Sequence, residues 1–544
     1  MSESIKNLTW ECYRLPGVSK PGEWSRLIER QLNAEGCPYS YDVTDYALRI
    51  WRIDSSVTEI AGSPYSCRNA FRIERVAFGG SSDDTLIGIS IARVFFEEGI
   101  SSPILSSTDK LFQKGKYPPV LRHQPMLEGI SDLVMYLACS PELSELEIHK
   151  DFDAIDLSSD VIYQTSDGKK NLLSLTRGDG LSKNLLNLVR NNVALQPVTI
   201  RLGLWAKVSK RSDASTHIAE RVVRVLREWG CAASWKELAS SEAVEEFIAD
   251  ANQFNLVLVP LEGKIGDRPP ENALGWIRYL DSENVAFQLC STSSNPIYSQ
   301  HGLAMMILQK AGGVHFSTRP ATGESFGNTW FVGLDLGRGG QRAGRIAAIT
   351  LTDSNGSLKA YWRALKDKTE SLPLDVLSHG LRWIVDQADE LDPSRHLVLI
   401  RDGRCPIDEN VDHYKTAMGQ RSFTFVEYVK GGNPLIHISL KEPNPGTILI
   451  PELSPFVAMY ACLDPHPGML SRPIKFRIRL NPDQFSKREV GEMLTSLCHS
   501  ATLSYQPSRI PAPLQWSNGL AKLSFTDLQF SGWTHLPHHK VDLR

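Results

Sequence analysis

The 544-residue sequence lacks the features that mark membrane-spanning, secreted and zinc-ribbon proteins. No apolar run approaches the roughly 18 residues needed to cross a bilayer, and the opening MSESIKNLTW has no apolar signal-peptide core. The nine cysteines are scattered without a Cys-x-x-Cys pair, which argues against a zinc ribbon or a disulfide framework. We therefore expect a cytoplasmic protein with no membrane partner.

The sequence also lacks a strong charge of either sign. Its formal net charge of −3 does not by itself indicate a nucleic-acid partner. It does not exclude one, because a local basic groove matters more than the global sum. A hydrophobic content of 42% is that of an ordinary soluble globular chain, and the length predicts about three or four domains.

The pattern of the chain changes near residue 195. The first 190 residues hold short strands and turns, which indicate an α+β region without a recognisable catalytic motif. Strands and helices then alternate, which predicts a small Rossmann-like parallel sheet ending near a Thr/Gly/Ser/Pro-rich boundary at 318–329. The expected strands are 197–208, 254–263 and 284–291, and the expected helices are 216–230, 271–280 and 298–313.

A second pattern begins with the strand WFVGLDLG, in which Asp335 is the one charged residue. Two more strands, a DSNG hairpin turn between them, a helix over 372–392 and a strand ending in Asp402 follow. This β-β-β-α-β order is ribonuclease H-like and places the first and fourth strands side by side. Asp335 and Asp402 would then be neighbours, and two adjacent carboxylates favour a divalent cation such as Mg²⁺ or Mn²⁺.

Other interpretations of Asp335 stay open at this point. An Asp in an apolar strand is often a structural hydrogen-bonding residue. GLDLG also resembles the first phosphate loop of the actin, Hsp70 and sugar-kinase ATPases. Only 209 residues follow Asp335, which is too few for the two lobes of such an ATPase. A plain structural α/β protein is the remaining alternative.

Four motifs in order give a more specific resemblance. They are WFVGLDLGRGG, HLVLIRDGRCPIDE, FVEYVKGGNPLIH and PSRIPAPLQWSNGLAKL, and together they resemble the PIWI domain of prokaryotic Argonautes. The preceding segment, which ends in YSQHGLAMMILQKAGGVHF, resembles the MID domain of the same family. The resemblance implies an N-terminal and linker region at 1–190 without an evident PAZ domain, a MID-like domain at 191–325 and a PIWI domain at 326–544.

The resemblance also implies a catalytic tetrad. Asp335 matches the first Asp and Asp402 the second, while Glu370 in DKTESLPL matches the mobile glutamate of the family. Asn518 in PAPLQWSN takes the fourth place, where Asp or His is more usual. Asp335, Asp402 and Asn518 would be the metal ligands, and the implied activity is a divalent-metal-dependent endonuclease.

In the MID-like segment the family binds the 5′ end of its guide strand. Gln288 and Lys310 match the family's Gln and Lys, and Arg278 is the expected basic partner because guanidinium suits phosphate. Some relatives fold their C-terminal carboxylate back toward the guide phosphate, which makes Arg544 a candidate. We expect the tail around His538 and His539 to be mobile and basic rather than a set of metal ligands.

Two functional hypotheses follow from the resemblance. The first is a cytoplasmic endonuclease that is loaded with a guide DNA or RNA and cuts complementary target nucleic acid, with DNA as the expected target, in defence against plasmids or phage. The second is a guided binder with a weak or inactive site that recruits a partner effector such as a nuclease or helicase. Asn518 and the missing PAZ domain motivate the second hypothesis.

Overall fold

A computed structural model describes most of the chain. The described residues are 8–20, 22–44, 47–78, 84–98, 100, 102–103, 124–150, 152–177, 180–205, 212–249, 254–261, 271–291, 296–321, 323–338, 345–366, 372–405, 410–429, 434–439, 441, 443–451, 456–459, 473–501, 504–522, 524–525, 528–529 and 536–542. No helix within these ranges is long and apolar enough to cross a membrane.

Internal contacts divide the chain into two compact units, each built from two separate segments. Unit 1 contains Met1–Asp156 and Lys430–Lys475, and unit 2 contains Leu157–Val429 and Phe476–Arg544. A late segment of the sequence therefore folds with its N-terminal part. The boundaries that we expected near residues 190 and 325 do not follow from this division and stay predictions.

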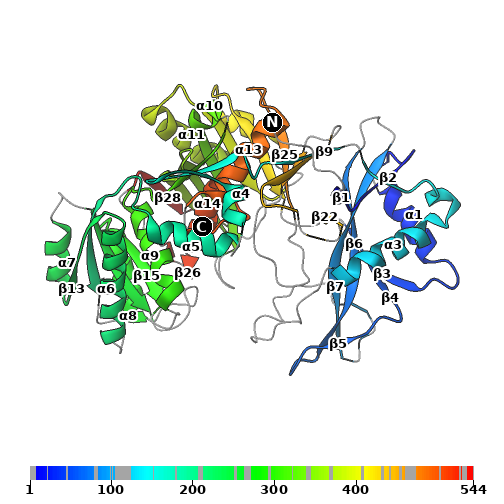
Figure 1. Cartoon of the computed structure of the whole chain (residues 1–544), viewed down its shortest axis with the longest axis horizontal. Coiled ribbons are helices and arrows are strands. Elements are labelled where there is room, and N and C mark those ends of the chain that lie inside the picture. The colour runs from blue at the N-terminus through cyan, green and yellow to red at the C-terminus, as the bar shows by residue number, and fades with distance from the viewer. Residues whose placement is uncertain are drawn as a thin grey trace. The chain divides into compact units, whose positions relative to one another are not determined.

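Unit 1 is built around an antiparallel sheet in the order β3-β4-β6-β7-β2-β8. Alternate residues of its strands, such as Leu48, Ile73 and Ile89, point into one core that helices α1 and α3 cover (Figure 1). The elements are β2 (Cys12–Leu15), α1 (Glu23–Leu32), β3 (Tyr39–Thr44), β4 (Ala47–Arg52), β5 (Thr58–Glu59), β6 (Tyr65–Phe78), β7 (Thr85–Glu97), α3 (Gln124–Ala138), the 3₁₀ helix η1 (Pro141–Leu143) and β8 (Glu147–Ile148).

Short strands join the two segments of unit 1. They are β1 (Leu8–Trp10) with β22 (Ile436–Ile438), and β9 (Phe152–Asp156) with β23 (Thr447–Pro451), which also pairs with β24 (Phe456–Met459). A buried polar contact supports the first pair, because His437 Nε2 lies 2.9 Å from Glu11 Oε1. The Tyr13 hydroxyl donates to the other Glu11 oxygen at 2.7 Å.

Unit 2 contains the expected Rossmann-like sheet, with four parallel strands in the order β13-β12-β14-β15. The strand β13 was not expected, because its mostly exposed sequence AASWKEL has no continuous apolar pattern. The elements are β12 (Thr199–Trp205), α6 (Ser212–Glu228), β13 (Ala232–Leu238), α7 (Ser241–Ile248), β14 (Phe254–Leu261), α8 (Glu271–Ser282), β15 (Ala286–Ser291) and α9 (Pro296–Lys310).

The second sheet of unit 2 confirms the ribonuclease H-like prediction. Its strands run in the order β28-β19-β18-β17-β20-β21-β25, and the first strand, β17, pairs in parallel with the fourth, β20. The expected DSNG turn is present, since Asp353 Oδ1 accepts from the Asn355 and Ser357 amides at 2.9 and 3.0 Å. The elements are β17 (Thr329–Arg338), β18 (Arg345–Thr352), β19 (Leu358–Lys366), α11 (Leu374–Leu391), β20 (His396–Asp402), α12 (Val411–Met418), β21 (Thr424–Val429), β25 (Ile474–Leu480), α13 (Lys487–His499), α14 (Ala512–Lys522) and β28 (His538–Asp542).

Helices cover both faces of this second sheet. Leu334 and Leu399 pack with α11 and α12 on one face. Ala348 and Tyr361 pack with Trp516 and Leu520 of α14 on the other face. The remaining elements of unit 2 are β10 (Val161–Thr165), β11 (Gly168–Asn171), α4 (Leu172–Thr176), α5 (Leu181–Asn191), β16 (Ser317–Pro320), α10 (Glu324–Gly327), β26 (Ser524–Phe525) and β27 (Leu528–Gln529).

Candidate metal centre and nucleic-acid interface

Asp335 and Asp402 lie side by side on neighbouring parallel strands. The pairing of β17 with β20 runs to Leu334 opposite Arg401, so that the next residue on each strand is one of the two Asp residues. Because side chains alternate along a strand, both carboxylates share one face of the sheet, and the strands that carry them are roughly 4.8 Å apart. Asp335 is 5% exposed, and the Oδ1 atom of Asp402 is buried.

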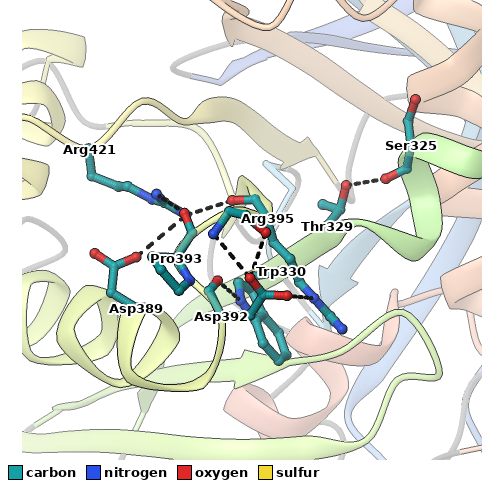
Figure 2. Close-up of polar contacts among 9 residues, drawn as sticks. Ser325, Thr329, Trp330, Asp389, Asp392, Pro393, Arg395 and Arg421 are labelled. Carbon is teal, nitrogen blue, oxygen red and sulfur yellow. Dashed lines mark hydrogen bonds and ion pairs between the residues drawn. The ribbon is translucent and has the colours of Figure 1, made fainter.

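A polar cluster at the opposite end of these strands supports their register (Figure 2). The Trp330 indole donates to the Asp392 carbonyl at 3.0 Å, and the Arg395 guanidinium stacks 4.4 Å from the Trp330 ring. Arg421 donates to the Pro393 and Arg395 carbonyls at 2.7 and 2.6 Å. The Trp330 contacts fasten the turn between α11 and β20 to the beginning of β17, and the Arg421 contacts fasten the same turn to the segment before β21. They thereby support the alignment that brings the two carboxylates together.

Helix α14 covers the face on which the carboxylates lie. A Cβ atom on Gly333 would lie 2.3 Å from the Pro513 carbonyl oxygen, so only glycine permits this close approach. Thr350 Oγ1 donates to the same carbonyl at 2.8 Å and fixes the first turn of α14. Asp335 is two residues after Gly333 and shares its face. Asn518 lies on α14 with a half-buried side chain, so the predicted fourth ligand belongs to the element that covers Asp335.

The backbone after Asp402 is held in a sharp turn. Gly403 has a φ of 81°, a left-handed conformation that favours glycine. The buried Arg401 guanidinium donates to the Asp402 and Arg404 carbonyls at 2.9 Å, and its Nε atom donates to the Tyr414 hydroxyl at 2.9 Å. Arg401 therefore positions the end of the strand that carries Asp402.

Two further residues occupy the same transverse row as the carboxylates. The row runs Arg363, Ala348, Asp335, Asp402 and Tyr428 across five strands. Burial lowers the pKa of the fully enclosed Arg363 guanidinium. Burial also raises the pKa of Tyr428, and the charge of Asp402 adds to that shift. Sequence reasoning missed both residues, although a charged residue inside the apolar strand AYWRAL is the same signal that identified Asp335.

The donor chemistry of this site fits a hard divalent cation. Carboxylate oxygens suit Mg²⁺ or Mn²⁺, and a cation relieves the repulsion between two neighbouring carboxylates. The third predicted carboxylate, Glu370, lies outside the described residues. Within the part of the chain that the structure describes, no group of three or more His, Cys, Asp or Glu side chains could hold a metal.

The predicted guide-binding residues fall into three groups. Lys310 at the end of α9 and Gln288 on β15 are brought together, because Lys310 Nζ donates to the carbonyl of Phe287, the residue before Gln288. Arg278 is exposed on α8, and no described contact joins it to the other two. Arg544 lies outside the described residues.

Both members of the close pair are buried. Burial lowers the pKa of Lys310 to about 7, so the ammonium group is close to losing its proton at neutral pH. Gln288 Nε2 donates to the Leu289 carbonyl at 2.8 Å, whereas its buried Oε1 accepts no hydrogen bond from any described residue. An acceptor without a donor is costly in a protein interior and marks a position that a ligand or water can satisfy.

The expectation of a mobile tail is wrong for residues 538–542. They form the edge strand β28, which pairs in parallel with β19. The His538 ring stacks on Tyr361 with centroids 5.3 Å apart, and the His539 ring lies 4.9 Å from that of His379. Backbone pairing and ring contacts therefore order residues 538–542, which the basic sequence led us to expect as a mobile tail.

Unit 2 thus combines a Rossmann-like sheet with a ribonuclease H-like sheet that carries two neighbouring carboxylates. The sequence matches no protein-family model and no curated protein. Among solved structures, the chain resembles Marinitoga piezophila Argonaute in complex with a 5′ OH guide RNA, with a TM-score of 0.60 and 14% identity, over 94% of this chain and 85% of that one.

Two further structures extend the likeness. Drosophila Piwi has a TM-score of 0.62 at 12% identity, covering 94% of this chain and 85% of that one. Clostridium butyricum Argonaute bound to a guide DNA and a 19-mer target DNA has a TM-score of 0.58 at 12% identity, covering 93% and 86%. The chain thus has the α/β fold of the Argonaute structures.

Proposed function

We propose that this protein binds a small guide strand and cleaves complementary target nucleic acid in a divalent-metal-dependent reaction. The neighbouring Asp335 and Asp402 carboxylates are the single observation that carries the proposal. The likeness to M. piezophila Argonaute in complex with guide RNA and target DNA, and to the C. butyricum complex with DNA, supports guided binding. We further propose DNA as the target and defence against plasmids or phage in the cytoplasm as the role.

The proposed function uses two separate sites, one for the metal ions and one for the 5′ end of the guide. Asp335, Asp402 and Asn518 would hold Mg²⁺ or Mn²⁺ on the face beneath α14, with Glu370 as a further acidic group. When bound, such ions lower the pKa of water and stabilise the leaving oxygen of a phosphodiester. Arg401 and Gly333 position the strands and the helix that carry these ligands. Gln288 and Lys310, with Arg278 and Arg544, would anchor the 5′ phosphate of the guide.

A cleavage assay tests the proposal. The full-length protein is incubated with a 5′-phosphorylated guide, a labelled complementary target and Mn²⁺, beside an Asp335→Asn/Asp402→Asn double variant. We expect a single cut in the target for the wild-type protein and none for the double variant. Asp412→Asn is the matched control, because Asp412 is an exposed aspartate on α12 of the same sheet domain, with a 79% exposed side chain.

The second candidate function is guided binding that recruits an effector protein. Asn518 favours it, because a neutral amide oxygen holds a cation more weakly than a carboxylate does. Tight guide and target binding without cleavage in Mg²⁺ or Mn²⁺ would select this function. Absence of guide binding would refute both candidates.

A further inference from the structure

An open groove with a volume of about 560 Å³ lies on the second face of the unit 1 sheet. Its floor contains Trp51 of β4 and Phe96 of β7, whose rings meet edge to face with centroids 5.8 Å apart. These two rings pack with Ala70 and Val94 in a small cluster of their own. The main core, with helices α1 and α3, uses the alternate residues of the same strands and so lies on the other face.

The rim of the groove exposes large aliphatic side chains. Ile53 is 56% exposed, and Val57 and Ile100 are each 48% exposed. The three come from separate places, since Ile53 lies in the turn after β4, Val57 directly before β5 and Ile100 three residues after β7, yet all line this one groove. Single exposed aliphatic residues are ordinary on protein surfaces, but a contiguous group around an aromatic floor is typical of an interaction site.

The charges around the groove are acidic. Glu97 and Glu98 line it, and Glu59 lies opposite the lining residue Ser66 in the β5–β6 ladder. Among the residues that the structure describes, neither Glu97 nor Glu98 is in an ion pair. The basic lining residue, Arg68, donates to the Ile53 and Ser55 carbonyls at 2.6 and 3.0 Å. The Arg68 guanidinium therefore already binds the turn that forms part of the rim.

This charge pattern distinguishes the possible occupants. A phosphate backbone would meet three carboxylates and an arginine that is already hydrogen-bonded, so nucleic acid is disfavoured. A second copy of the chain, docked through the same groove by two-fold symmetry, would bring Glu97 and Glu98 of both copies together. A different protein with basic residues beside an apolar anchor would satisfy both the exposed aliphatic rim and the carboxylates.

We propose that this groove docks a segment of another protein in which an aliphatic or aromatic side chain is flanked by Lys or Arg. The apolar side chain would rest on the Trp51 and Phe96 rings between Ile53, Val57 and Ile100. The basic residues would lie against Glu97 and Glu98. The proposal concerns unit 1 alone and does not depend on guide binding or on target cleavage.

Selection from a displayed library of random peptides on the full-length protein tests the proposal. We expect enrichment of peptides that carry an apolar residue beside Lys or Arg. The best peptide should bind an Ile53→Glu/Val57→Glu variant at least about tenfold more weakly. Met135→Glu is the matched control, because Met135 is 60% exposed on α3, outside the groove, and its replacement should leave binding unchanged.

Reversing the charge of the groove distinguishes this proposal from non-specific hydrophobic binding. The Glu97→Lys/Glu98→Lys variant should shift the enriched peptides from basic to acidic flanking residues. The proposal would be overturned if the same basic peptides were enriched on the Glu97→Lys/Glu98→Lys variant, or if they were still enriched on the Ile53→Glu/Val57→Glu variant. It would also be overturned by light scattering that reveals a dimer abolished by Ile53→Glu/Val57→Glu, or by single-stranded DNA binding that the same variant loses.

Discussion

Replacing Gly333 with alanine tests whether α14 holds the candidate metal centre together. The added Cβ would lie 2.3 Å from the Pro513 oxygen, 2.4 Å from its carbonyl carbon and 2.9 Å from the Leu514 nitrogen. All three are backbone atoms, so the clash cannot be relieved by a change of side-chain rotamer. The helix must move away from the strand by about an ångström, and overpacking of this kind typically costs about 1–3 kcal/mol.

Scanning calorimetry measures the expected loss of stability. For a domain of this size, about 1–3 kcal/mol corresponds to a fall of roughly 2–12 °C in the melting temperature. The two units can unfold separately, so the comparison concerns the transition that contains unit 2. Hydrogen exchange should be faster in the first turns of α14, where Thr350 donates to Pro513, than in wild-type protein.

Gly275→Ala is the control for this substitution. Gly275 lies in α8, and a Cβ added there meets nothing within 4 Å. Alanine is the better helix former, so the melting temperature should stay equal or rise slightly. If Gly333→Ala melts and exchanges like the wild-type protein, the close approach of α14 to β17 is wrong, and with it the placement of Asn518 over the carboxylate face.

Three further predictions concern charge, metal and the strand register. The affinity for a 5′-phosphorylated guide should fall by up to about tenfold per pH unit as pH rises above about 7, because Lys310 then loses its proton. Fluorescence anisotropy should show this fall in the wild-type protein and not in the Lys310→Met variant. The stability of the free protein should change in the opposite direction. Because the pKa of buried Lys310 is lowered, the free energy of unfolding should rise with pH between about 7 and 10.5. Chelation of divalent ions should abolish target cleavage in a gel assay, and Mn²⁺ should restore it. Arg421→Ala should lower stability by about 1–3 kcal/mol through the loss of its bonds to the Pro393 and Arg395 carbonyls, while the exposed Lys415→Ala should change little in calorimetry.

The sequence was informative where local patterns determine structure. The helix over 372–392 and the strands around Asp335 and Asp402 have regular apolar periods, and their order alone predicted that β17 and β20 pair. The assignment of Glu370, Asn518, Arg278 and Arg544 rests on resemblance, and these roles stay predictions. The wrong expectation was the mobile tail, because the edge pairing of β28 with β19 joins residues far apart in the chain and leaves no local pattern.

Long-range pairing also explains what the sequence could not predict in unit 1. The strands β22 and β23 belong to a segment that follows β21 in the chain, yet they pair with β1 and β9 in the first 156 residues. Short strands of this kind carry too few residues for a period to be recognised. The buried contact between His437 and Glu11 could not be inferred either, since each residue alone looks like an ordinary surface charge.

The alternation along β17 connects the fold of unit 2 with its chemistry. Val332 and Leu334 point into the core beneath α11, so Gly333 and Asp335 must point to the other face. A shift of one residue would bury Asp335 in the apolar core and place a leucine against Pro513, and both changes are strongly unfavourable. The register that buries the leucine therefore also presents the carboxylate to the face beneath α14. For this reason Asp335 can be isolated in an apolar strand without weakening the fold, provided that a cation or a donor on that face balances its charge.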